Sequence, residues 1–139
     1  MPTIAADLTG GCLCGTVRYR LTAQPFDLGW CHCRMCQLNS GSPAMVFGSV
    51  ALDDYAIQQG AEAIRKYCSS EKAERWFCGE CGTPLLFREL DGRTYDFSVA
   101  TLDDPGAAPP EKHIYYSSHI PWAEAADDRL PRYPQSSRG

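Results

Sequence analysis

Apolar and polar residues alternate with a period of two along much of this 139-residue chain. In the range 17–21, valine, tyrosine and leucine alternate with two arginines, and in the range 95–99, tyrosine, phenylalanine and valine alternate with aspartate and serine. Alternation places the two sets of side chains on opposite faces of a strand, so both segments are predicted to be half-buried strands. The ranges 44–50 and 63–67 are weaker strand candidates.

A hairpin is predicted in the second half of the chain. The apolar-rich segments 85–90 and 93–99 are separated by Asp91-Gly92. This dipeptide suits the left-handed backbone angles of a two-residue hairpin turn. We therefore expect the two segments to pair as antiparallel strands.

Helical signals are short. Residues 34–39 can form one helical turn ended by Ser40-Gly41, and residues 123–128 can form another. The range 103–110 is rich in proline, glycine and alanine and is expected to be a loop, and 131–139 is expected to be a loose tail. The fold class that follows is mainly β with short helical turns.

Length and composition are those of an ordinary globular protein. The chain is 44% hydrophobic and 22% charged, and its length suits one domain spanning residues 1–139. Its start carries Asp7, no basic segment and no long apolar stretch, and no run in the chain is long enough to span a bilayer. We therefore expect no signal peptide, no membrane partner and a cytoplasmic location.

The cysteines carry the strongest functional signal. The chain has eight, about 6% of its residues, which is below the roughly 8–10% that marks disulfide scaffolds. A disulfide-stapled secreted domain is therefore a poor fit, and metal binding is favoured. Seven of the eight fall in three groups: Cys12 and Cys14; Cys31, Cys33 and Cys36; Cys78 and Cys81.

Seven thiolates are the wrong number for two closed four-thiolate sites. If the two pairs together hold one tetrahedral zinc, the triplet supplies three sulfurs and leaves a fourth position for water or substrate. A metal with an open position can do chemistry. The alternative is a fourth protein ligand, for which His32, His113, His119 and Cys68 are the candidates; His32 is the weakest because it should project opposite to its neighbours.

The spacing within each group has a mechanical reason. Glycines flank or lie within both pairs, where they let the backbone turn its amides toward sulfur, as in zinc knuckles. In the triplet, Cys31 and Cys33 point the same way if they end a strand, and Cys36 joins them from the following turn. The formal charge of −4, lowered further by thiolates, argues against non-specific binding to nucleic acid.

Four motifs, in this order, resemble the glutathione-dependent formaldehyde-activating enzyme family, which includes the centromere protein V relatives. The likeness covers residues 10–133. The motifs are Gly11-Cys12-Leu13-Cys14-Gly15-Thr16-Val17-Arg18-Tyr19; Cys31-His32-Cys33-Arg34-Met35-Cys36; Phe77-Cys78-Gly79-Glu80-Cys81-Gly82-Thr83-Pro84-Leu85; and His113-Ile114, Trp122 and Leu130-Pro131-Arg132-Tyr133.

The resemblance implies a mostly antiparallel, Mss4-like β fold with two zinc ions per chain. It implies a structural zinc on Cys12, Cys14, Cys78 and Cys81, and a catalytic zinc on Cys31, Cys33 and Cys36. The implied activity is that of a carbon–sulfur lyase acting on S-(hydroxymethyl)glutathione or a similar thiol–aldehyde adduct. The competing hypothesis is a non-catalytic, zinc-stabilised binding module for protein or nucleic acid.

Substrate contacts are less well defined by the sequence. Arg34 and Arg75 can meet the carboxylates of an anionic thiol such as glutathione, although charges beside a zinc knuckle are commonly solvated surface. His113 and Trp122 are placed near the site by the resemblance alone. Cys68 lies outside the metal-binding groups and is expected to be a small buried hydrophobe. Its surrounding segment, 65–70, also resembles the reactive-cysteine segment of B-type methionine sulfoxide reductases, but its order relative to the second cysteine pair differs.

Overall fold

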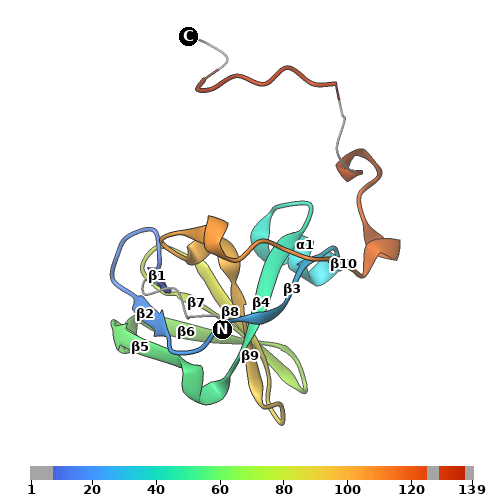
Figure 1. The fold of residues 1–139 in the computed structure, drawn as a ribbon. Coiled ribbons are helices and arrows are strands. Elements are labelled where there is room, and N and C mark those ends of the chain that lie inside the picture. Colours follow the sequence, from blue (N-terminus) through green and yellow to red (C-terminus); the bar gives the residue numbers. More distant parts are fainter. Residues whose placement is uncertain (1–7, 125–128, 137–139) are drawn as a thin grey trace.

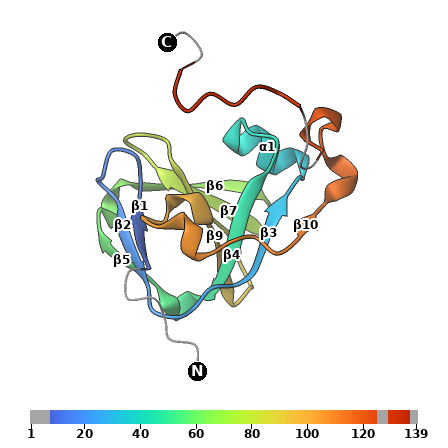
Figure 2. The same ribbon diagram turned by 45° about the horizontal axis from the view of Figure 1, so that its top comes forward.

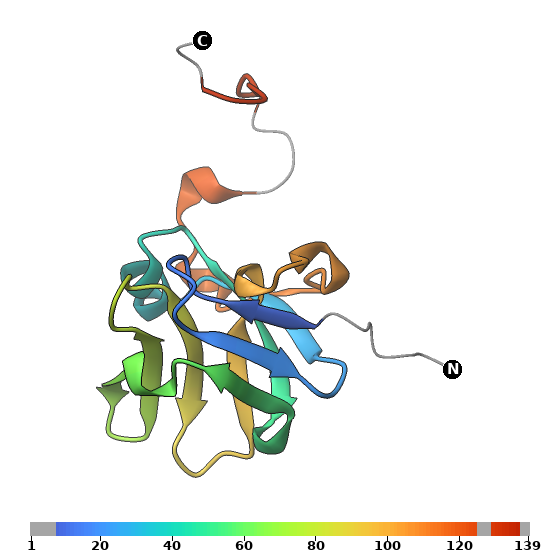
Figure 3. The ribbon, with the colours of Figure 1, turned by 90° about the vertical axis from the view of Figure 1, so that its left-hand side faces the viewer.

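Two β-sheets pack against each other (Figure 1 and Figure 3). The computed structural model describes residues 8–124 and 129–136. The small sheet has the order β1-β2-β5, with β1 at Thr9–Gly11, β2 at Arg18–Leu21 and β5 at Tyr55–Gln59. The large sheet has the order β10-β3-β4-β9-β8-β7-β6. Its strands are β3 (Phe26–Cys31), β4 (Met45–Ala51), β6 (Ile64–Ser70), β7 (Ala73–Cys78), β8 (Pro84–Glu89), β9 (Thr94–Ser98) and β10 (His113–Ile114).

The mainly β, mostly antiparallel architecture expected from the sequence is confirmed. All strand pairs are antiparallel except β10, which runs parallel to β3. The weaker strand candidates at 44–50 and 63–67 correspond to β4 and β6. The predicted strands belong to both sheets, but β1, β3, β5, β7 and β10 were not predicted from the sequence.

The main core lies between the two sheets. Tyr19 and Leu21 of β2 and Tyr55 of β5 meet Phe97 of β9 and Trp76 of β7 in one buried cluster. Tyr19 and Tyr55 stack with their ring centroids 4.4 Å apart. Each such side chain contributes roughly 1.5–3 kcal/mol by leaving water. The alternation in 17–21 is confirmed, because its apolar members are buried.

Strand β9 departs from the half-buried pattern predicted for it. Phe97 faces the core, as expected, but Ser98 on the opposite face is also buried, and Asp96 is partly buried in a cavity. On this second face, Asp96 lines a cavity on one side of the large sheet instead of facing bulk solvent. Alternation thus identified the strand correctly but assigned its polar face wrongly to solvent.

The predicted hairpin is confirmed, and its predicted turn is wrong. Strands β8 and β9 pair with Leu86 opposite Phe97. However, neither Asp91 nor Gly92 adopts a positive φ angle. The amide of Gly92 instead donates to the carbonyl of Glu89 at 3.0 Å, which closes a four-residue turn that needs no left-handed residue.

The helical segments are short, as expected. Helix α1 (Arg34–Ser40) begins at Cys33, whose sulfur accepts the amide of Cys36, and ends at Gly41 with φ 67°. A 3₁₀ turn at Pro121–Ala123 precedes the second predicted helical segment, of which residues 125–128 lie outside the described residues. Across the part of the chain that the structure describes, no helix is long and apolar enough to cross a membrane.

The remaining loop predictions agree with the described residues. The segment 103–110 is a loop with one 3₁₀ turn at Pro105–Ala107. In the predicted tail, residues 131–136 form no helix or strand, and 137–139 lie outside the described residues.

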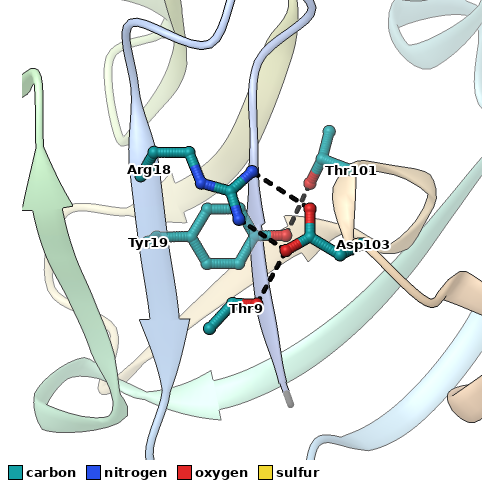
Figure 4. A network of polar contacts seen from close by, with 5 residues as sticks. All are labelled: Thr9, Arg18, Tyr19, Thr101 and Asp103. Carbon is teal, nitrogen blue, oxygen red and sulfur yellow. Dashed lines mark hydrogen bonds and ion pairs between the residues drawn. The ribbon is translucent and has the colours of Figure 1, made fainter.

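A polar network fastens the small sheet to the segment that follows β9 (Figure 4). The guanidinium of Arg18 donates to both carboxylate oxygens of Asp103, and the Thr9 hydroxyl donates to the same carboxylate at 2.7 Å. The hydroxyls of Tyr19 and Thr101 lie 2.7 Å apart. Because the chain continues from Asp103 to β10, this network also sets the path of the strand beside β3.

Candidate metal centres

The two cysteine pairs meet in one group, which we call the four-cysteine cluster. The sulfurs of Cys12, Cys14, Cys78 and Cys81 all lie within 4.8 Å of one another. The Cys12–Cys14 and Cys14–Cys78 sulfur distances are 3.5 and 3.9 Å. Tetrahedral zinc with Zn–S bonds of about 2.3 Å places its sulfurs about 3.8 Å apart, so this donor set fits the metal. The grouping of the pairs is as the sequence arithmetic predicted.

Two tight turns build this cluster. Cys12 and Cys14 lie between β1 and β2, whereas Cys78 is the last residue of β7 and Cys81 lies between β7 and β8. Each turn contains a glycine that needs the left-handed region, Gly15 at φ 81° in one and Gly82 at φ 82° in the other.

Backbone amides in both turns point at sulfur. The amide of Val17 donates to Cys12 at 3.2 Å, and that of Glu80 donates to Cys78 at 3.4 Å. Such bonds fix the direction of a thiolate ligand and reduce its charge. The knuckle geometry predicted from the flanking glycines is therefore present.

Local hydrogen bonding separates the pKa values of the clustered thiols. The Thr83 hydroxyl is the main cause that lowers the pKa of Cys81 to about 5, whereas burial raises the pKa of Cys78 to about 11. The lowered pKa favours the thiolate form of Cys81. A thiolate is the form that binds zinc.

The third group of cysteines forms a separate site, which we call the three-cysteine cup. Cys31 is the last residue of β3, Cys33 caps α1, and Cys36 lies in its first turn. The Cys33–Cys36 and Cys31–Cys36 sulfur distances are 3.1 and 3.4 Å, somewhat shorter than the roughly 3.8 Å of a zinc tetrahedron. This is the strand-end and following-turn arrangement predicted from the spacing. Figure 2 shows α1 at the ends of β3 and β4, with β10 beside β3.

Hydrogen bonds within the cup lower the pKa of Cys31. The thiol of Cys36 donates to the Cys31 sulfur, and this bond lowers the pKa of Cys31 to about 6 while it raises that of Cys36. The lowered pKa favours a thiolate at Cys31, which suits a cation.

No fourth histidine, cysteine or carboxylate completes the cup among the described residues. His32 projects away from it, as expected, and its Nε2 lies 2.8 Å from Nδ1 of His113. The ring of His119 is also on that side, 6.2 Å from the His32 ring. Cys68 is exposed on β6, so the expectation that it is a buried hydrophobe is wrong. All four candidates for a closing ligand thus lie elsewhere.

The cup opens into a cavity of about 430 Å³ on one face of the large sheet. In β4, Val46 and Val50 face the main core, whereas Phe47 and Ser49 line the cavity. The lining consists of Asp27, Gly29, Cys31, Cys33, Met35, Cys36, Phe47, Ser49, Arg75, Phe87, Glu89, Asp96, Lys112, Ile114 and Tyr115.

The two arginines predicted to bind substrate carboxylates lie in different places. Arg75 lines the cavity but is only 7% exposed, and both of its Nη atoms lie 3.6 Å from the Cys36 sulfur. It therefore faces a sulfur of the cup. Arg34 is exposed on α1, donates to Gln37 at 3.2 Å and does not line the cavity.

The two residues placed near the site by resemblance are not in the cavity. Trp122 is 72% exposed in its 3₁₀ turn. His113 lies on β10, where its ring meets His32 on the side away from the cup. Its neighbours Lys112 and Ile114 line the cavity instead. Successive side chains in a strand point to opposite faces, so Lys112 and Ile114 face the cavity while His113, which lies between them, points to the other side.

Sequence reasoning missed the polar residues of the cavity. Ser49 and Asp96 form a cross-strand pair, joined by a hydrogen bond of 2.7 Å, and Glu89 lies at the end of β8. Their only sequence signal was the polar half of the alternating pattern, which is the same for a solvent face and for a cavity wall.

Comparisons with known proteins agree with this architecture. The family model described as "Glutathione-dependent formaldehyde-activating enzyme" matches residues 7–118. An uncharacterised lyase of Schizosaccharomyces pombe is 34% identical over 93 residues, which cover 67% of this chain and 66% of that protein. The match thus spans slightly less than two thirds of that relative.

A solved structure extends the likeness to three dimensions. The crystal structure of a Rhodobacter sphaeroides protein matches 76% of this chain and 98% of its own, with 25% identity and a TM-score of 0.61. The chain therefore belongs to the glutathione-dependent formaldehyde-activating enzyme family.

Proposed function

We propose that this protein is a zinc-dependent carbon–sulfur lyase that acts on the adduct of a small thiol with an aldehyde. The observation that carries the proposal is a three-cysteine cup that opens into a cavity and has no fourth ligand among the described residues. The family and the lyase name of the Schizosaccharomyces pombe relative support the reaction class. In this proposal, the four-cysteine cluster holds a second, structural zinc.

Zinc on Cys31, Cys33 and Cys36 would supply a Lewis-acidic position at which a substrate sulfur is stabilised as a thiolate. The chain's own residues prepare the surroundings of that position. Arg75 places a positive charge beside the cup, where it offsets the charge of several thiolates. Phe47 and Phe87 supply apolar cavity wall that restricts water near the reacting group.

The bond changes in the proposed reaction balance without a co-reactant. The carbon–sulfur bond of the adduct breaks and its electron pair stays on sulfur. The hydroxyl oxygen loses its proton and forms the carbonyl of the released aldehyde, and the proton ends on the thiol or in solvent. Hydroxymethyl glutathione, the adduct implied by the family's name, is a first substrate to test.

The test compares thiols with their S-methyl derivatives on zinc-loaded protein. Mercaptoethanol and glutathione are each measured against the methylated compound by calorimetry in two buffers of different ionisation enthalpy. We expect the thiols to bind better and to release a proton, because a thioether cannot become a thiolate. Formaldehyde release from each adduct is then measured with the same protein.

Two variants make the result specific to the cup. Cys33→Ser should abolish thiol binding and formaldehyde release, whereas Cys68→Ser, an exposed cysteine outside both sites, should leave them unchanged. Equal binding of a thiol and its S-methyl derivative, with no proton released, contradicts thiolate activation. Full activity of Cys33→Ser contradicts the assignment of the cup.

The alternative of a purely structural second metal makes a different prediction. It requires a fourth protein ligand, and His32, His113, His119 and Cys68 all lie away from the cup. X-ray absorption of the zinc-loaded protein with and without a thiol distinguishes the two. A gain of one sulfur ligand supports the enzyme, and an unchanged first shell supports the binding module.

A further inference from the structure

The cavity extends well beyond the cup. Cys31 is paired with Met45 at one end of β4, whereas Asp96 is paired with Ser49, four residues further along the same strand. At about 3.3 Å per residue, these two levels of the sheet are roughly 13 Å apart. Both Cys31 and Asp96 line the same cavity. A substrate bound by its sulfur at the cup therefore has room for a tail that reaches the other end.

The cup end of this cavity is lined by a buried cation. Arg75 is 7% exposed and has no carboxylate partner among the described residues, and its Nε has no hydrogen-bond partner. Its Nη atoms lie 3.6 Å from the Cys36 sulfur, and its guanidinium lies 5.1 Å from the centroid of the Phe87 ring. A buried guanidinium is costly unless an anion faces it, and here the sulfurs of the cup are the groups that it faces. This end therefore suits an anionic ligand atom, as a thiolate sulfur is.

The far end of the cavity is lined by carboxylates. Lys112 forms an ion pair with Asp27 and offsets one of them. Asp96 is partly buried and accepts the hydroxyl of Ser49, whereas Glu89 is exposed and has no ion-pair partner among the described residues. Burial raises the pKa of Asp96, and the charges of Glu89 and Asp27 raise it further. The charges of Glu89 and Asp27 thus reach Asp96, and neither Asp96 nor Glu89 forms an ion pair with a cation among the described residues.

We propose that the cavity selects thiol adducts whose tail ends in an ammonium or another cationic group, in preference to tails that end in a carboxylate. Asp96 and Glu89 are the specificity-determining residues, and Arg75 with the cup receives the sulfur. This inference rests on the proposed function for the sulfur end of the substrate. It also ranks glutathione, which carries two carboxylates and one ammonium group, below cationic thiols of similar length.

The size of the effect follows from charge-assisted contacts. A hydrogen bond to a charged group that is partly buried, as Asp96 is, is worth enough to change affinity by about tenfold or more. We therefore expect an ammonium tail to bind at least about tenfold more tightly than a hydroxyl tail. A carboxylate tail should bind more weakly than the hydroxyl tail, because like charges repel.

The test uses three thiols that differ only in the terminal group. Aminohexanethiol, mercaptohexanol and mercaptohexanoic acid each carry the thiol and the second group at opposite ends of a six-carbon chain, about 9 Å apart when extended. Their affinities for zinc-loaded protein are measured by calorimetry at neutral pH and at two salt concentrations. The short pair cysteamine and mercaptoethanol serves as a length control, because its ammonium stays near Arg75.

We expect the order amine, alcohol, acid for the long thiols, with a spread that shrinks in high salt. The short pair should show little or no preference for the amine. In the Asp96→Asn, Glu89→Gln double variant, the advantage of the long amine should disappear. Asp91→Asn, which changes an exposed carboxylate in the neighbouring turn, should keep it.

Each other result overturns a specific part of the argument. Equal affinities of the three long thiols in the wild-type protein overturn the substrate class and leave the lyase proposal standing. A preference for the amine that survives in the folded double variant overturns the assignment to Asp96 and Glu89. If no thiol binds, the proposed function and the substrate class fall together.

Discussion

The two cysteine sites should contribute very differently to stability, and two matched variants measure the difference. Cys78 of the four-cysteine cluster and Cys31 of the three-cysteine cup are both buried, at 0% and 6% exposure. Alanine at either position removes one sulfur ligand and leaves a similar small void. The variants Cys78→Ala and Cys31→Ala therefore differ mainly in the loop that the lost metal contact had closed.

The expected magnitude comes from the lengths of those loops. A metal in the four-cysteine cluster joins Cys14 to Cys78, which are 64 residues apart, whereas the cup joins Cys31 to Cys36, only 5 residues apart. By analogy with a covalent cross-link, closing the long loop removes about 4 kcal/mol of unfolded-state entropy and closing the short loop about 2 kcal/mol. Cys78→Ala should therefore be about 2 kcal/mol more destabilising than Cys31→Ala, which corresponds to roughly 8 °C in melting temperature for a chain of this size.

The assay is thermal and urea unfolding of the zinc-loaded variants, repeated after exhaustive chelation. We expect the gap between the variants to close once the metal is removed, because neither loop is then cross-linked. If Cys31→Ala is as destabilising as Cys78→Ala with zinc bound, the division into a structural and an open site is wrong. A gap that persists without metal would instead trace the difference to packing around Cys78.

Three further predictions use other features of the fold. Mild chelation of protein loaded with two zinc ions should remove about one of them while circular dichroism stays unchanged, because the open site exchanges its metal faster. Loss of both zinc ions in one step would contradict a difference in exchange rate between the two sites. The pKa of Asp96 is raised in the folded state above 3.8, so the contribution of its carboxyl to stability is present below that pH and is lost as pH rises through the folded pKa. In urea unfolding, Asp96→Asn should therefore raise the free energy of unfolding more at pH about 7 than at pH about 4. An equal gain in the free energy of unfolding at both pH values would show that burial does not raise the pKa of Asp96. Gly82→Ala should lower the free energy of unfolding by about 1 kcal/mol, because the φ angle of Gly82 is 82°. Gly106→Ala, at a position without a positive φ, should lower it by less than about 0.5 kcal/mol in the same urea unfolding assay. Equal losses would show that a side chain does not strain the left-handed turn.

The sequence alone determined the grouping of the cysteines and much of the secondary structure. The number and spacing of the cysteines separated the two pairs, which include Cys78, from the triplet that begins at Cys31. This grouping can be made from the sequence without knowledge of any tertiary contact. Short-range rules were also sufficient for helix α1 and for the hairpin of β8 and β9, because a cap, a terminal glycine and a period of two act within a few residues.

Only the tertiary structure decided the charge of the cavity and the role of Arg75. Polar alternation at Ser49 and Asp96 is the same whether a strand faces solvent or a cavity, and the strand order of the large sheet settles which it is. Likewise, Arg75 is 39 residues from Cys36 in sequence, and no local pattern indicates that its guanidinium reaches that sulfur. Backbone geometry constrains residues that share a strand or a turn. Arg75 and Cys36, in contrast, meet because strands that are distant in sequence pair in the large sheet and α1 packs near the same face. The chemistry of the cavity therefore depends on the whole fold.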